Sequence, residues 1–358
     1  MARQWGWMVQ RRRSGIAFLA AAIFVLAACT QGDQTSPVSP TAPNGESGEG
    51  TPAEVILGDT APLTGLPFGD ENLNRPSLAA KVDNHPAARP HVALDRADIV
   101  FESLVEGGLT RYVAFWHSDI PPEIGPVRSV RPMDPDIASP FGGILAYSGG
   151  QQRFVEAMLQ TPVESAIHGQ SNVNDFFYRS QDKVAPHNVI VRAVDLVANF
   201  ADKAPPKQQF VYASDQATAT AVTSGDEVVS FTTRFSSFQA PSWEWSAGER
   251  AFLRSQTNGA ADVALSGQRI AAANVVSLFV DIQVIQDIPT TFLVSSGSGF
   301  VASGGHIMPV TWSKDSPEAV IQLRDASGQE VALVPGITWV ELLPAPGSGV
   351  LAGDVLIN

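Results

Sequence analysis

The sequence predicts an α+β protein, in which a mixed α/β N-terminal domain (residues 59–203) precedes a smaller, mostly antiparallel β domain (228–345). In the first part, apolar strand-like runs alternate irregularly with helical patterns, for example 142–147 followed by 151–160. In the second part, short β-rich runs follow one another between Gly, Asn, Asp and Ser. A stretch with Pro205-Pro206 and many Thr, Ser and Ala predicts a linker over 204–227.

A β-hairpin is the central element that we expect in the N-terminal domain. Two β-rich runs, 99–106 and 109–117, flank Gly107-Gly108, a pair that tolerates the positive φ of a tight hairpin turn. A two-residue loop would place Glu106 opposite Leu109, Leu104 opposite Arg111 and Glu102 opposite Val113. Alternation then puts Glu102, Glu106, Arg111 and His117 on a polar face and Phe101, Val105, Tyr112 and Trp116 on a core face. A helix over 97–105 is the competing interpretation, because Glu102 and Glu106 are four residues apart.

The other expected elements follow in chain order. The N-terminal domain adds strands at 77–83, 142–147 and 188–191, helices at 151–160 and 194–200, and a polar-aromatic loop or short helix at 175–179. The C-terminal domain has strands at 228–234, 243–245, 251–254, 274–284, 291–294, 306–312, 319–324 and 337–342, and a hairpin loop at 295–299. We interpret Pro186-His187-Asn188 as a capped loop ahead of a strand.

The N-terminus predicts an export signal. Arg11-Arg12-Arg13 precede an apolar run over 15–26 that is too short to span a membrane, and small residues lead to the only cysteine, Cys29. The run Leu26-Ala27-Ala28-Cys29 resembles the lipobox of bacterial lipoproteins. That resemblance implies cleavage after residue 28, a lipid on Cys29 and an extracytoplasmic protein anchored to the outer face of the cytoplasmic membrane. Residues 29–58 have the composition of a flexible tether. The alternative is an uncleaved anchor with a chance cysteine.

Charge limits the partners that we expect. The chain has a formal net charge of −13, and about −17 without the four signal arginines, which disfavours nucleic acid as a partner. The single cysteine excludes an intramolecular disulfide. No phosphate-binding glycine loop or dinucleotide fingerprint is present, and we predict no cofactor.

Several strings resemble the YerB-like bacterial lipoproteins, a family built on a two-part domain of unknown function. They include Pro62-Leu63-Thr64-Gly65-Leu66-Pro67, Lys81-Val82-Asp83-Asn84-His85-Pro86, Val105-Glu106-Gly107-Gly108-Leu109-Thr110-Arg111 and Gly125-Pro126-Val127-Arg128-Ser129-Val130-Arg131. Later strings, Thr311-Trp312-Ser313-Lys314 and Pro335-Gly336-Ile337-Thr338-Trp339, resemble its C-terminal part. The resemblance implies a lipoprotein with a mixed N-terminal domain and a C-terminal β domain, and supplies no activity or catalytic residue.

Polar residues gather along the N-terminal domain and predict one cleft. It would be lined by the polar hairpin face, the Asp83-Asn84-His85 turn and the loop 128–131. Guanidinium groups bind carboxylate or phosphate through paired hydrogen bonds, so the predicted ligand is a small anion or an envelope partner. The predicted ligand-binding residues are Arg111, Arg128, Arg131, Asn84 and His85. The alternative for the arginines is a structural ion network with Glu102, Glu106 and Asp134.

Two further functions stay open at this stage. Glu102, Glu106 and Asp83, with His85, are candidate catalytic residues for an envelope hydrolase that acts on wall glycan or peptide. A metal site from Asp83, His85, Glu106 and His117 is possible by residue type, but no spacing matches a zinc signature, and we predict none. A purely structural interaction module is the third alternative, and the sequence does not give the oligomeric state.

Overall fold

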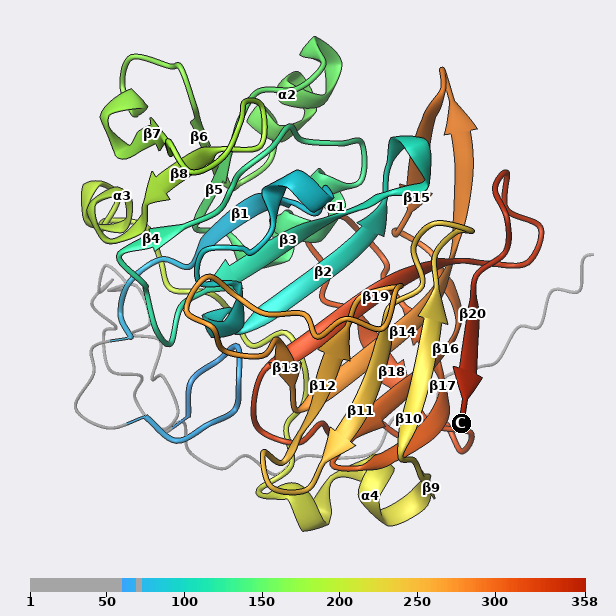
Figure 1. Ribbon diagram of the computed structural model, residues 1–358. Coiled ribbons are helices and arrows are strands. Elements are labelled where there is room, and N and C mark those ends of the chain that lie inside the picture. The colour runs from blue at the N-terminus through green and yellow to red at the C-terminus, as the bar shows by residue number, and fades with distance from the viewer. Residues whose placement is uncertain (1–59, 69–72) are drawn as a thin grey trace, which may run out of the picture. The chain divides into compact units, whose positions relative to one another are not determined.

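A large mixed sheet organises the protein in the computed structural model, which describes residues 60–68 and 73–358. Its path runs β18-β17-β16-β14-β19-β2-β3-β1-β5-β6, with β15 paired to β14 and β9 to β17 (Figure 1). These strands are β1 (Leu78–Asp83), β2 (Ile99–Leu104), β3 (Thr110–Trp116), β5 (Ile144–Tyr147), β6 (Glu164–Ile167), β9 (Asp226–Glu227), β14 (Asn274–Ile285), β15 (Ile288–Phe292), β16 (Ser296–Ser303), β17 (His306–Ser313), β18 (Gln322–Arg324) and β19 (Thr338–Pro344).

Two smaller sheets and four α-helices complete the described part. The five-stranded sheet has the order β13 (Ala271–Ala272), β12 (Ala251–Ser255), β11 (Ser242–Ser246), β10 (Ser230–Arg234), β20 (Asp354–Ile357). The three-stranded sheet has the order β4 (Glu123–Ile124), β8 (Val189–Arg192), β7 (Phe177–Arg179). The helices are α1 (Asp134–Ala138), α2 (Gln152–Leu159), α3 (Ala193–Asn199) and α4 (Thr220–Ser224). The predicted α+β class is confirmed.

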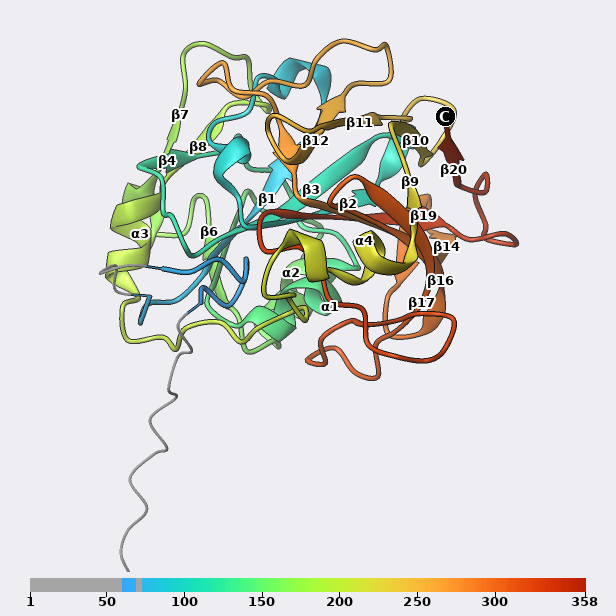
Figure 2. The same cartoon turned by 90° about the horizontal axis from the view of Figure 1, so that it is seen from below.

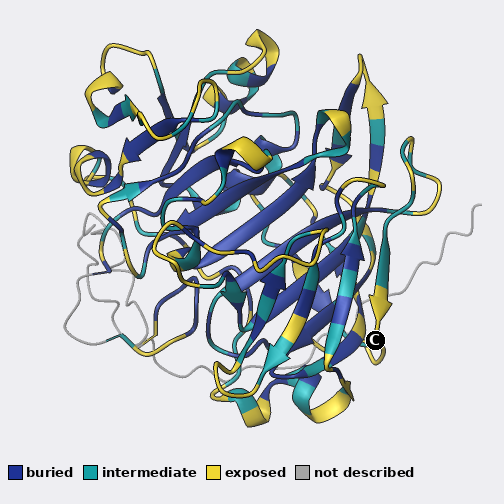
Figure 3. Cartoon of the chain, in the orientation of Figure 1, coloured by how far each residue is buried: buried dark blue, intermediate teal, exposed yellow. Residues whose placement is uncertain are grey.

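Both faces of the large sheet are covered. On one face, Tyr112 and Trp339 pack with Trp243 and Phe252 of the five-stranded sheet. On the other, strand residues such as Phe101 pack with residues of α1 and α2. Figure 2 shows this layering, and in Figure 3 the central strands are buried along their length. A strand enclosed in this way has no solvent face to which its polar side chains can point.

The double burial explains why the predicted hairpin is right in outline and wrong in register. β2 and β3 are antiparallel, but Leu104 pairs with Thr110 and Glu102 with Tyr112, one residue away from the expected register. Instead of a two-residue turn, residues 105–109 form the connection, which contains a 3₁₀ turn at Glu106–Gly108. Since facing residues share a side of the sheet, Glu102 lies on the side of Tyr112, opposite to Arg111. The predicted polar face does not exist.

The prediction of a hairpin loop for the glycine-rich segment 295–299 is also wrong. It belongs to strand β16, which pairs with β14 and β17. A Cβ on Gly299 would lie 2.5 Å from the carbonyl oxygen of Ser277, and one on Gly297 would lie 2.7 Å from that of Phe279. The glycines therefore serve the close approach of neighbouring backbones.

The two halves of the chain contribute to the same sheet. β19, from the C-terminal half, pairs in parallel with β2 of the N-terminal half over Ile99–Ser103. The segment predicted as a linker contains α4 and β9, and β9 pairs with β17. The predicted domain boundaries stay a prediction.

Candidate functional site

The candidate site lies at one edge of the large sheet, where the parallel strands β1, β5 and β6 end together. The chain continues as Asp83-Asn84-His85 at β1, Ser148-Gly149-Gly150 at β5 and His168-Gly169 at β6. Carboxyl ends of parallel strands are where open α/β sheets hold their ligands. This edge therefore collects polar residues from three separate parts of the sequence.

The loop 127–131 is held between the ends of β1 and β5. The backbone N–H of Arg128 donates to the carbonyl oxygen of Lys81 at 2.7 Å, and the N–H of Ser148 donates to that of Arg128 at 3.0 Å. The N–H of Val130 donates to the carbonyl of Gly149 at 3.1 Å. These bonds fix the positions from which Arg128 and Arg131 extend.

Three guanidinium groups meet at this loop, and we call Arg111, Arg128 and Arg131 the arginine cluster. Arg111 and Arg131 both donate to the carbonyl oxygen of Ser129, at 2.9 and 3.3 Å. Arg131 also forms an ion pair with Glu106 at 2.7 Å. Arg128 makes no side-chain hydrogen bond with any described residue, and its Nε lies 3.3 Å from Asp83 Oδ2. Arg111 and Arg131 thus share one acceptor, and the role of the three arginines as ligand-binding residues stays a prediction.

The charges in the cluster act on one another. Burial lowers the pKa of Arg111 to about 10, with a further lowering by Arg131 and Arg128 and opposition from Asp83 and Glu106. For Glu106, burial raises the pKa, but the hydrogen bond and the charge of Arg131 outweigh it, and the pKa lies below its usual value. Glu106 is therefore held as a carboxylate beside Arg131.

Asp83 connects the cluster to a pair of histidines. His187 Nδ1 lies 2.6 Å from Asp83 Oδ2, the oxygen that also faces Arg128. The ring of His187 stacks on that of His85, with centroids 4.3 Å apart and planes at 15°. His85 Nδ1 accepts a hydrogen bond from the backbone N–H of Ala87 at 3.1 Å. Asp83 itself is buried, whereas the His187 side chain is 16% exposed.

Two predicted site residues do not belong to this cluster. Glu102 is fully buried on the other face of the sheet, where it accepts hydrogen bonds from Arg254, Thr110 and Trp339. Its placement corrects the expectation of a carboxylate lining the cleft. Asn84 is buried within the turn after β1, where it binds Thr110 and Arg89. Its side chain holds the turn in shape.

The sequence interpretation missed the residues that complete the edge. His187 follows the cis peptide bond Ala185-Pro186 and reaches Asp83 from a segment about a hundred positions later in the chain. His168 Nδ1 lies 3.3 Å from Ser148 Oγ. The sequence shows His187 only as a polar residue ahead of a strand, and no local spacing links it to Asp83 at the end of β1.

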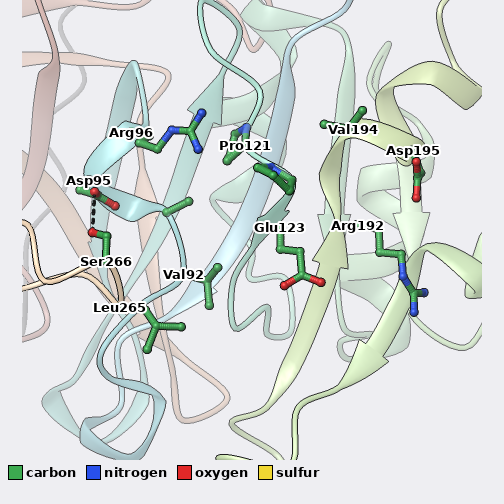
Figure 4. A pocket seen from close by; sticks show the side chains of 12 residues that line it. Val92, Asp95, Arg96, Pro121, Glu123, Arg192, Val194, Asp195, Leu265 and Ser266 are labelled. Carbon is green, nitrogen blue, oxygen red and sulfur yellow. Dashed lines mark hydrogen bonds between the residues drawn. The ribbon is translucent and has the colours of Figure 1, made fainter.

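A pocket lies elsewhere on the described part of the chain. A pocket of about 630 Å³ opens between the segment 92–96, the turn at Leu265 and the ends of β4 and β8 (Figure 4). Val92, Pro121 and Leu265 line it with Glu123 and Arg192. None of the predicted site residues is among its lining, so it is distinct from the predicted cleft.

Two kinds of feature are absent from residues 60–68 and 73–358. No helix there combines the length and the apolar content that a membrane crossing needs. No group of three or more His, Cys, Asp or Glu side chains is arranged to hold a metal ion. Cys29, the predicted lipidation site, lies outside the described residues.

Comparison with known proteins identifies relatives along most of the chain. Residues 63–207 match the N-terminal domain of a protein family of unknown function (DUF3048), and residues 231–340 match its C-terminal domain. The chain is 26% identical over 294 residues to "Putative lipoprotein YerB" of Bacillus subtilis (strain 168), with 79% of this chain and 86% of that protein covered.

A solved structure shows the same fold. The crystal structure of the YerB protein from Bacillus subtilis superposes with a TM-score of 0.70 at 22% identity, covering 83% of this chain and 99% of that chain. The two domain matches together span most of the sequence, in the order expected from the motifs. The chain therefore belongs to the YerB-like family, which is built on this two-part domain of unknown function.

Proposed function

We propose that this protein is a lipid-anchored envelope protein that binds a small oxyanion, a phosphate or carboxylate group, through the arginine cluster. Cys29 would carry the lipid and residues 29–58 would tether the folded part outside the cytoplasmic membrane. A relative named as a lipoprotein supports the anchor. The proposed ligand-binding residues are Arg111, Arg128 and Arg131, with His85 beside them.

One observation carries the binding proposal: Arg111 and Arg131 converge on a single neutral acceptor, the carbonyl oxygen of Ser129. Like charges brought together at a partly buried site cost free energy, because low local dielectric strengthens their repulsion. The nearby acids do not cancel it, since Glu106 pairs with Arg131 and Asp83 is shared by Arg128 and His187. An anion would compensate the excess positive charge.

Arg128 is the residue best placed to make first contact. Its side chain is 25% exposed, and its guanidinium has no hydrogen-bond partner among the described residues. Arg131 is 11% exposed and already bound to Glu106, so it would contribute mainly charge. Arg128 is ion-paired with Asp83 at 3.3 Å, but without a hydrogen bond to it, so its N–H groups stay available to an anion.

The hydrolase built on paired carboxylates finds less support. That mechanism needs two unpaired acids in an open cleft. Glu102 is buried against Arg254, Glu106 pairs with Arg131, and Asp83 faces Arg128 and His187. None of the three has the environment that an acid–base pair of carboxylates requires.

The test is a calorimetric titration of the full chain, purified in detergent micelles, with inorganic phosphate and separately with succinate. Loss of one charge-assisted hydrogen bond, worth about 1.5–3 kcal/mol, should weaken binding roughly 10- to 150-fold in Arg128→Ala. Arg324→Ala is the matched control, because Arg324 lies on β18, at the other end of the sheet path. Absence of binding by the wild type to either anion would refute the proposal.

The anchor has its own test. In cells labelled with a radioactive fatty acid, the wild-type chain should incorporate label and sediment with membranes. Cys29→Ser should lose the label, since the cysteine sulfur is the proposed attachment point. Equal labelling of the two chains would show that Cys29 is not the lipidated residue.

A further inference from the structure

We propose that His187, held by Asp83, is a general base and that the arginine cluster positions a phosphate monoester for hydrolysis by water. This inference rests on the proposed anion site and adds an activity to it. It starts from the Asp83–His187 contact at 2.6 Å, the geometry in which a buried carboxylate orients an imidazole.

The contact with Asp83 determines which nitrogen of the His187 ring can accept a proton. A carboxylate only accepts hydrogen bonds, so the Nδ1 of His187 carries the proton that it donates to Asp83. In the neutral ring, Nε2 then has the lone pair. Nε2 forms no hydrogen bond with any described residue. It is also not a fully buried atom, so it is accessible to solvent. An accessible acceptor nitrogen with an oriented ring is what a general base requires.

The surroundings of the ring keep it in place. His85 stacks on His187 at a centroid distance of 4.3 Å, and His85 is itself fixed by the Ala87 N–H. Asp83 is held by the backbone N–H of His85 at 3.2 Å and by Arg128. The imidazole is therefore restrained both through its Nδ1 and through its face, whereas a histidine that only caps a loop would need neither.

The substrate class follows from the cations beside the base. Arg128 and His187 share one carboxylate oxygen, so an anion bound by Arg128 lies next to the imidazole. In phosphoryl transfer, charge spreads over three equatorial oxygens, and catalysis depends on positioning and cationic stabilisation. Three converging guanidinium groups match that demand better than they match a single carboxylate.

The proposed reaction balances without any further reagent. Nε2 of His187 takes a proton from water while the water oxygen forms a bond to phosphorus. The bond from phosphorus to the ester oxygen breaks, and the alcohol leaves with the electron pair. The proton on His187 then passes to the leaving oxygen or to solvent, which gives inorganic phosphate and an alcohol.

The decisive experiment measures hydrolysis of para-nitrophenyl phosphate and binding of inorganic phosphate on the same preparations of the full chain. In His187→Gln, hydrolysis should fall roughly 10²- to 10⁴-fold, the range for a lost general base, while the Kd for phosphate changes less than about tenfold. His306→Gln is the matched control, a partly buried histidine on β17. It should leave both quantities unchanged.

Each other outcome has a distinct meaning. Phosphate binding without hydrolysis by the wild type overturns the catalytic proposal and leaves the anion site standing. No binding and no hydrolysis overturns both. Unchanged hydrolysis in His187→Gln, or loss only in His168→Gln, also overturns it, because the base would then lie elsewhere. Asp83 is a positioning residue, so Asp83→Asn should lower kcat and alter the pH profile of the rate.

Discussion

Removal of the Arg254 side chain should destabilise both halves of the protein at once. Arg254 lies on β12 and is fully buried. Its guanidinium donates to Glu102 of β2 at 2.9 Å and to Asp262. Trp339 and Trp243 lie with their ring centroids 5.1 and 5.8 Å from it. The ion pair with Glu102 therefore joins the five-stranded sheet to the large sheet across the core.

The magnitude follows from what Arg254→Ala would leave behind. Removing one partner of a buried pair costs about 3–5 kcal/mol, because the remaining charge is buried without compensation. Here two carboxylates, Glu102 and Asp262, lose their shared cation. A typical domain has about 5–15 kcal/mol of stability in total, so this loss is a large share of it.

Urea unfolding, followed by tryptophan fluorescence and by far-UV circular dichroism, measures the effect. The control is Arg234→Ala on β10 of the same five-stranded sheet, because Arg234 pairs with Asp354 at 2.9 Å but is 41% exposed. Exposed pairs contribute about 0–1 kcal/mol, so this variant should lose little. A loss below about 1 kcal/mol in Arg254→Ala would refute the reasoning, as would two separate transitions that leave one half unaffected.

Other predictions concern single buried positions. Burial, and then the charge of Glu102, raises the pKa of Glu341 to about 7, so the folded state holds this proton more tightly than the unfolded chain does. Stability should therefore fall by roughly 3 kcal/mol as pH rises from about 4.5 to about 7, and urea unfolding across pH should show that Glu341→Gln removes this component. Gly65→Ala should lower stability by more than about 1 kcal/mol in thermal unfolding, since Gly65 has φ +65° and a Cβ would lie 2.3 Å from the Tyr212 ring. Lys81→Met should cost about 3–5 kcal/mol in urea unfolding, because Asp134, 2.7 Å from Lys81 Nζ, would stay buried without its cation.

The sequence predicts elements well where local signals decide them. The expected helix at 151–160 corresponds to α2, and the expected strand at 274–284 corresponds to β14. An amphipathic pattern marks the helix, and a mostly apolar run rich in Val marks the strand, each within a single stretch of chain. The fold class follows from the same local signals, because strands and helices mix in the first half and strands dominate the second.

The hairpin shows where local reasoning stops. Period-two alternation identifies a polar face only if one face of the strand meets solvent. In its local sequence Glu102 has the pattern of a surface residue. In the structure it is buried and forms an ion pair with Arg254, which lies 152 positions later in the chain. The partner of Asp83 in the site, His187, is 104 positions away. Such long-range charge pairs leave no trace in spacing or periodicity, so the arginines could be predicted and the dyad beside them could not.

The division of the family into two sequence domains does not correspond to two sheets. The N-terminal match ends at residue 207, but β2, the strand that it would leave at an edge, pairs with β19, which begins within the C-terminal match (231–340) and continues to Pro344. β19 in turn lies between β2 and β14, parallel to both. Without β19, β2 would be an edge strand, and one full row of its backbone N–H and C=O groups would be unpaired. The C-terminal half thus supplies the sheet continuity and, through Arg254, the buried charge that β2 requires. Because β3 and β1 follow β2 across the sheet, the strands that carry Arg111 and Asp83 belong to the same continuous sheet as β19 and β14 of the C-terminal half.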